Sequence, residues 1–441
     1  MTTKILHTIE NFFQLSRHNT SWRVELLAGC TTFLTMAYIL FVNPQILSTT
    51  GMDITAVFIA TALASCIGCF LMALLANYPI AIAPGMGLNA YFTYTIVHHY
   101  GYSWQTALGA TLIAGVLFIL ISASKIRKTI IQAIPHSLAI GISVGIGLFL
   151  IVISLENCNI MNAQANSFHF GTLHSYAALF FLCGLTMIVI LESLRIRAAI
   201  ILSILCITIA SIIIGINQYQ GIISLPHGLE KTALAFNFHS LLSSNGLAVI
   251  LSIVIVMLFD NTGTLIGVLR RTHLTHNSEA DTERLSRALL ADSIAACSAG
   301  CLGSSTTTTY IESASGIRAG GRTGLTAVVV GLLFLTAIFF SPLIKTIPSY
   351  AVAPALFYVG CVMFKHITQL EWREITEWIP AIFIIITIPL TFSIANGIGA
   401  GFISYFIFKA LRGKIRSVHW LLTLLTAIFA IYFIYLFISN K

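Results

Sequence analysis

Two carboxylates in strongly apolar surroundings are the first candidates for chemistry. Asp260 lies inside Val-Met-Leu-Phe-Asp-Asn-Thr-Gly-Thr-Leu-Ile-Gly (256–267), and Glu312 comes shortly after the hydroxyl run 304–309. A carboxylate at the centre of a membrane helix costs about 2.5–3.5 kcal/mol on insertion scales, so it needs a partner or a function. The functional interpretation is a site for a polar substrate or a coupling proton. The structural alternative is a pair satisfied by backbone and hydroxyl donors.

Polar groups that could complete such a site occur on two stretches. The hydroxyl run from Ser304 to Thr309 can satisfy backbone groups that are freed where a helix starts inside a membrane. A helix that starts there directs its positive end at the site. Asn89, after a Pro-Gly-Met-Gly stretch, offers an amide that donates and accepts at once. This combination suits a flat heterocycle with ring N–H and carbonyl edges, and it suits a full anion less because two carboxylates would repel it.

The composition is that of an integral membrane protein. Of the 441 residues, 57% are hydrophobic and only 9% are charged, whereas soluble domains carry about a quarter charged residues. The formal net charge of +8 reflects basic loops on the cytoplasmic side of a membrane, so no nucleic-acid partner is expected. The sequence contains no metalloprotease, nucleophile-elbow or Walker motif, so neither a cofactor, a metal nor an enzymatic activity is expected.

Apolar stretches that could form membrane helices recur along the whole chain. Fourteen segments and one additional stretch are predicted, at 28–47, 54–75, 81–97, 104–122, 136–154, 175–192, 198–216, 246–269, 285–301, 304–317, 323–341, 350–364, 377–393, 395–411 and 418–438. Basic residues follow every even-numbered segment, and the positive-inside rule places such residues on the cytoplasmic side. The N-terminus is therefore expected on the cytoplasmic side of a bacterial inner membrane. After the fourth segment these residues are Lys125, Arg127 and Lys128.

The third and tenth segments cannot be complete membrane helices. Residues 79–92 are interrupted by Pro and Gly, and residues 303–316 begin with the hydroxyl run. These two segments occupy matching places in two halves of seven, and an odd number of crossings inverts the second half relative to the first. Interrupted segments in corresponding positions of inverted halves indicate the binding site of a transporter.

These blocks resemble the AzgA-like purine permeases of the nucleobase/ascorbate transporter superfamily. The resemblance covers nearly the whole chain and is carried by residues 27–44, 83–92, 259–267, 308–316 and 320–326. It implies an all-α polytopic fold of two inverted repeats of seven segments, with short strands in the broken segments. It further implies import of adenine, guanine or hypoxanthine with protons. The implied domains are an amphipathic segment (1–25), a core (26–125 and 246–345), a gate (126–245 and 346–416) and an additional C-terminal helix (417–441).

The resemblance also implies roles for individual residues. The carboxylates of the eighth and tenth segments fall on Asp260 and Glu312, which would bind substrate and the coupling proton, and the amide of the third segment falls on Asn89. The remaining predicted substrate-site residues are Gly85, Gly87, Thr264, Thr308, Thr309 and Tyr310. Relatives carry a further acid where this chain has Met257, which leaves the proton stoichiometry open.

Other interpretations remain open at this stage. A pyrimidine or anion transporter of the same fold is the nearest alternative, and a channel is the alternative from another class. The expected partners are a purine nucleobase, protons, the lipid bilayer and, by analogy with relatives, a second copy in a gate-to-gate dimer. The stretch 418–438 is apolar all round and contains no charge, so an additional crossing that leaves Lys441 outside is expected.

Overall fold

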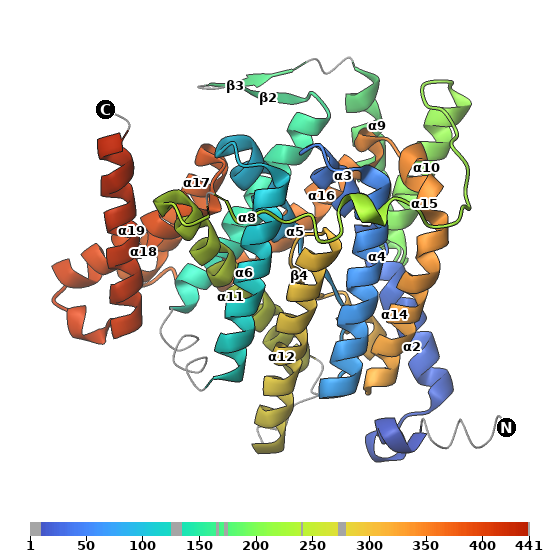
Figure 1. The fold of residues 1–441 in the computed structure, drawn as a ribbon, viewed down its shortest axis with the longest axis horizontal. Coiled ribbons are helices and arrows are strands. Elements are labelled where there is room, and N and C mark those ends of the chain that lie inside the picture. The colour runs from blue at the N-terminus through green and yellow to red at the C-terminus, as the bar shows by residue number, and fades with distance from the viewer. Residues whose placement is uncertain are drawn as a thin grey trace.

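The computed structural model describes residues 10–124, 135–164, 167–171, 175–239, 241–271 and 279–439. Residues 1–9, most of the basic loop after the fourth segment and Lys441 lie outside this range. In the described part, ten helices are long and apolar enough to cross a membrane. Figure 1 shows α4, α6, α12 and α14 running roughly parallel through the molecule. The chain is therefore an all-α polytopic membrane protein, as its sequence predicts.

One set of elements combines the first four segments with the eighth to the eleventh. From the first half it contains α2 (Trp22–Met36), α3 (Ile39–Ser48), α4 (Ile54–Leu71), the π-helix η2 (Met72–Ala76), β1 (Ile82–Pro84), α5 (Met86–Ala90), the π-helix η3 (Tyr91–His99) and α6 (Trp104–Ala123). From the second half it contains α11 (Ser244–Arg271), α12 (Glu279–Leu302), β4 (Thr307–Thr309), α13 (Ser313–Arg318) and α14 (Gly324–Ala337). Within this set α12 packs on α4 and α6, and α14 packs on α2 and α4.

A second set combines the fifth to seventh segments with the twelfth to fourteenth. Its members are α8 (His136–Asn157), α9 (Tyr176–Ser193), α10 (Ala199–Ile213), α16 (Ser349–Phe364), α17 (Ile375–Thr391) and α18 (Ile394–Leu411). Here α8 packs on α16 and α17, and α9 packs on α10 and α16. The matching helices α8 and α16 approach closely at two glycines. A Cβ on Gly147 would lie 2.7 Å from the carbonyl oxygen of Gly360, so only glycine permits this crossing.

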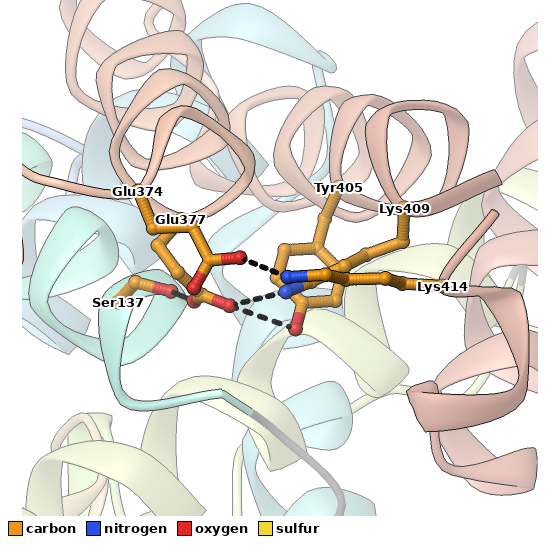
Figure 2. Close-up of polar contacts among 6 residues, drawn as sticks. All are labelled: Ser137, Glu374, Glu377, Tyr405, Lys409 and Lys414. Carbon is orange, nitrogen blue, oxygen red and sulfur yellow. Dashed lines mark hydrogen bonds and ion pairs between the residues drawn. The ribbon is translucent and has the colours of Figure 1, made fainter. Parts of the chain in front are cut away.

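A polar network ties the helices of the second set together (Figure 2). Glu377 of α17 pairs with Lys409 of α18 at 2.7 Å, and both side chains are largely buried. The same carboxylate accepts hydrogen bonds from Ser137 of α8 at 2.5 Å and from Tyr405 of α18 at 3.2 Å. A buried charge is tolerated only when it is paired and hydrogen-bonded, and Glu377 meets both conditions.

Three features differ from or add to the sequence-based expectations. A hairpin of β2 (Met161–Gln164) and β3 (Ser167–Phe170) follows α8 and was not predicted. At the N-terminus, Phe13 and Leu15 are buried against Ala73 and Ala327, so this end of the amphipathic segment packs on protein rather than on lipid. The additional stretch forms α19 (Trp420–Ser439), which packs on α18 and α11.

Candidate substrate site

Two short strands meet at the centre of the first set of helices, at a place that we call the strand crossing. β1 and β4 pair antiparallel, with Ala83 opposite Thr308. The pairing is extended at both ends, because Gly85 N donates to Thr306 O and Tyr310 N donates to Ala81 O, each at 3.0 Å. The broken third and tenth segments therefore satisfy each other's backbone groups, which a membrane interior demands of any non-helical chain.

Gly85 lets the two broken segments meet beside Asp260. A Cβ on Gly85 would lie 2.0 Å from Cγ2 of Thr308 and 3.7 Å from Oδ2 of Asp260. No side chain fits at that first distance, so glycine is required by the close approach of the two strands. The carboxylate of Asp260 consequently stands directly beside the crossing point, and its side chain is partly exposed.

Glu312 is positioned by a residue from the first segment. Tyr38, at the joint between α2 and α3, donates its hydroxyl hydrogen to Glu312 Oε1 at 2.7 Å. Tyr38 itself is almost completely buried, whereas Glu312 is partly exposed. The carboxylate thus has a fixed orientation within a side chain that is not fully enclosed.

Asn89 lies on α5 and faces the hydroxyl run. Its Oδ1 accepts a hydrogen bond from the hydroxyl of Ser305. Its Nδ2 is buried and has no hydrogen-bond partner among the described residues. An unsatisfied buried amide donor calls for an acceptor, and a ligand with a ring nitrogen or carbonyl could supply one.

Tyr310 connects the two broken segments through its side chain. Its hydroxyl donates to Pro84 O at 2.6 Å, so its side chain ties the tenth segment to the third. Glu312 follows Tyr310 by two residues in the chain. The backbone amides of Gly85 and Tyr310 are used in the strand pairing, so they cannot donate to a substrate.

The remaining predicted residues of the site differ in which residues they contact. Thr308 contacts Gly85, and Thr309 Oγ1 donates to Asn261 O at 3.3 Å. Gly87 packs against the second set of helices, since a Cβ there would lie 2.8 Å from Cγ2 of Ile146. Thr264 is one helical turn beyond Asp260 on α11 and is partly exposed, and no described contact joins it to the others.

Sequence reasoning missed two residues of this region. Tyr38 occurs in the block that carries the resemblance, but nothing in the sequence places it on Glu312. Asp292, in the predicted ninth segment, is fully buried, and the rule that singled out Asp260 would have found it. Met257 is also fully buried, within the main apolar cluster. Among the described residues no group of three His, Cys, Asp or Glu side chains could hold a metal ion.

A polar centre on two broken segments, contributed by both halves of a polytopic helical protein, defines a membrane transport protein. The chain belongs to the Permease family, which it matches over residues 23–400.

Relatives of similar length support this assignment. The chain is 44% identical over 434 residues to a putative permease of Methanocaldococcus jannaschii, covering 98% of this chain and 99% of the relative. It is 42% identical to the adenine permease AdeP of Escherichia coli, covering 93% and 92% of the two chains. It is also 42% identical to the guanine/hypoxanthine permease PbuO of Bacillus subtilis, covering 97% and 100%.

Solved structures share the fold at low identity. The transmembrane domain of the cyanobacterial bicarbonate transporter BicA matches with a TM-score of 0.66 at 19% identity, covering 86% of this chain and 97% of that domain. SLC26A9 matches with a TM-score of 0.65 at 10% identity, covering 93% of this chain and 69% of that one. These matches support the inverted-repeat architecture and carry no information about the substrate.

Proposed function

We propose that this permease imports purine nucleobases together with protons across a bacterial inner membrane, with its N-terminus in the cytoplasm, and that it is not an enzyme. The observation that carries the proposal is the pair of partly exposed carboxylates, Asp260 beside the paired strands and Glu312 shortly after β4. Carboxylates accept hydrogen bonds from N–H groups, and every purine base presents at least one ring N–H. Two of the relatives are named for adenine and for guanine and hypoxanthine.

Each group at the crossing has a part in recognition. Asp260 and Glu312 accept from the purine N–H groups, and the orphan Nδ2 of Asn89 donates to a ring nitrogen or a carbonyl. The amides of the first turn of α5 supply further donors, since the first N–H groups of a helix lack intrahelical partners. A fully charged anion would meet two negative side chains, which disfavours the anion alternative.

The division into two sets of helices suits alternating access, in which one set moves against the other. The first set is the core that carries the substrate, and the second set is the gate, held rigid by the glycine crossing of α8 and α16 and by the Glu377 network. The sets meet at Gly87 against Ile146. They also meet where Arg197, before α10, donates to Thr31 Oγ1 at 2.9 Å. An elevator-like movement of the core exchanges such contacts for others, whereas a channel would keep them.

Competition for uptake tests the substrate class. Cells that lack their own purine and pyrimidine permeases would express this chain and receive labelled hypoxanthine. Unlabelled adenine, guanine or hypoxanthine should suppress uptake, whereas uracil and bicarbonate should not. Suppression by uracil or bicarbonate alone would replace the purine proposal with the pyrimidine or anion alternative.

A protonophore tests the mode of transport. Saturable accumulation that collapses when the proton gradient is dissipated supports symport. Non-saturable flux that never exceeds equilibrium would indicate a channel and contradict the proposal.

A further inference from the structure

Asp292 is a buried carboxylate that the substrate site does not use. It lies within α12, its side chain is fully buried, and neither Oδ1 nor Oδ2 has a hydrogen-bond partner in the described part of the chain. Burying an ion without a partner costs several kcal/mol even after the protein relaxes. An ionised Asp292 is therefore incompatible with this conformation, and a neutral, protonated side chain removes the cost.

Among the residues that the structure describes, no Lys or Arg side chain hydrogen-bonds to Asp292. Ala288 and Ala295, on the same face of α12, belong to an apolar cluster that also receives Leu265 from α11 and Met72 from η2. The described groups that can titrate or carry charge on the packed elements are Asp260 of α11, Cys66 and Cys69 of α4, Tyr78 beyond η2, and Glu283, Arg284, Arg287, Cys297 and Cys301 of α12 itself. The guanidinium of Arg284 donates to Ala76 O and stacks on the ring of Tyr78.

A second unsatisfied polar group faces the same cluster. Asn261 is fully buried on α11, and both its Nδ2 and its Oδ1 lack hydrogen-bond partners among the described residues. It lies one turn before Leu265 and two turns before Val268, and both of these belong to the cluster that surrounds Asp292. Two helices thus turn an unsatisfied polar group toward one apolar space, which is rare in native proteins and asks for a specific explanation.

This space adjoins the substrate site. Asn261 follows Asp260 in the chain, and its backbone carbonyl accepts the hydroxyl of Thr309 from β4. The helices that carry Asp260 and Asp292, α11 and α12, both pack on β4. Two carboxylates held in one apolar region disfavour a state in which both groups are ionised.

We propose that Asp292 binds the coupling proton, with Asn261 as its polar neighbour; the inference rests on the purine–proton symport proposed above. A proton taken from water on the outer side forms the O–H bond of the Asp292 carboxyl, and release to water on the inner side restores the carboxylate. A purine N–H needs an ionised Asp260 as its acceptor, and an ionised Asp260 favours a protonated Asp292. Substrate and proton therefore bind together. A metal cation would need several oxygen ligands, which the Ala, Leu, Val and Met side chains of the cluster do not supply.

The test uses purified protein in liposomes and separates net transport from exchange. Purine–purine exchange needs no net proton movement, whereas accumulation against a gradient does. Asp292→Asn keeps the shape of the side chain and cannot carry the proton. We expect it to retain exchange and purine-induced thermal stabilisation and to lose accumulation driven by an imposed proton gradient. Accumulation equal to that of the unmodified protein, or accumulation driven by a sodium gradient, would overturn the inference.

Two further variants control for structural effects. Ser293→Ala alters the neighbouring buried residue, which contacts Ser122 at 2.7 Å, and should keep normal coupling. Asp292→Glu retains the acid, so infrared difference spectra between acidic and alkaline samples should contain a protonated-carboxyl band that this variant shifts. A band that Asp292→Glu leaves unchanged contradicts proton binding at this position even if Asp292→Asn does not fold. An unmodified protein that moves no purine would refute the proposed function, while the infrared band would still test Asp292.

Discussion

At the scale of single residues, Glu312 shows how a carboxylate that is energetically costly to bury is oriented for a ligand. The hydroxyl of Tyr38 orients one carboxylate oxygen from the joint of α2 and α3, in the middle of the first segment, and the partly exposed side chain keeps lone pairs available for a substrate. Its environment therefore supports binding more strongly than a purely structural role, in which the carboxylate would be enclosed.

Glu312→Gln should weaken purine uptake by about ten- to a hundredfold, because a hydrogen bond to a charged group contributes about 1.5–3 kcal/mol. The variant should still reach the membrane, since Tyr38 can donate equally to an amide oxygen. Initial rates of labelled hypoxanthine uptake at several concentrations measure the effect. Glu283→Gln, on a side chain that is 67% exposed, is the matched control and should transport normally. Uptake by Glu312→Gln at the normal rate would remove Glu312 from the binding site.

Gly85→Ala should abolish uptake, because the added methyl group would sit 2.0 Å from Cγ2 of Thr308 and force the strands apart. Forced overpacking of this kind costs about 1–3 kcal/mol, and here the strain falls on the substrate site. Gly267→Ala on α11 is the control, since a Cβ there meets no described atom within 4 Å. Purine binding measured by thermal stabilisation would compare the two. Equal binding by both variants would mean that the strand crossing does not shape the site.

At the scale of elements, the two ion pairs of Figure 2 differ in burial and should differ in consequence. Lys409 and Glu377 are 8% and 17% exposed, whereas Lys414 and Glu374 are 56% and 40% exposed. Removal of one partner of a buried pair leaves an uncompensated charge, whereas exposed pairs contribute little because water screens them.

Glu377→Gln should therefore lower the free energy of unfolding by about 3 kcal/mol, and Glu374→Gln should lower it by less than about 1 kcal/mol. Thermal unfolding of the two variants in the same detergent gives the comparison. If both variants unfold with the unmodified protein, the network does not stiffen the gate.

The broken elements were predictable, but their contacts were not. Pro and Gly at 79–92 and the hydroxyl run at 304–309 are local signals, and they locate both interruptions correctly. Which strand pairs with which depends on tertiary structure. The use of the Gly85 and Tyr310 amides in the pairing could therefore not be read from the sequence. The bond from Tyr38 to Glu312 spans 274 residues and leaves no local pattern. The hairpin of β2 and β3 lies between two membrane segments, outside the apolar stretches from which the sequence predicts helices.

At the scale of the whole molecule, the fourteen predicted segments all correspond to helices or to broken strand–helix elements of the structure. The fifteenth apolar stretch also forms a helix, α19, which stands beside α18 and runs from the bottom to the top of Figure 1. Its direction is compatible with an additional crossing outside both repeats. The side of the membrane on which α19 ends can be measured with a topology reporter.

A reporter that is active only in the cytoplasm should be silent when it is fused after α19 and bright when it is fused after Gly413, which follows α18. The difference is expected because the basic residues between the two helices favour the cytoplasm and α19 carries no charge. Activity at both positions would place α19 along the inner surface of the membrane.

The strand crossing also constrains how the protein is made. Pro84 and Tyr310, which meet there, are 226 residues apart in the sequence, so synthesis must reach the tenth segment before the third segment finds its partner. Until then the third segment has unpaired backbone groups that lipid cannot satisfy. Contacts of such long range form late and slowly, because the intervening chain must be ordered first. While only its first half has been made, the nascent permease therefore depends most on the membrane insertion machinery and is most exposed to proteases.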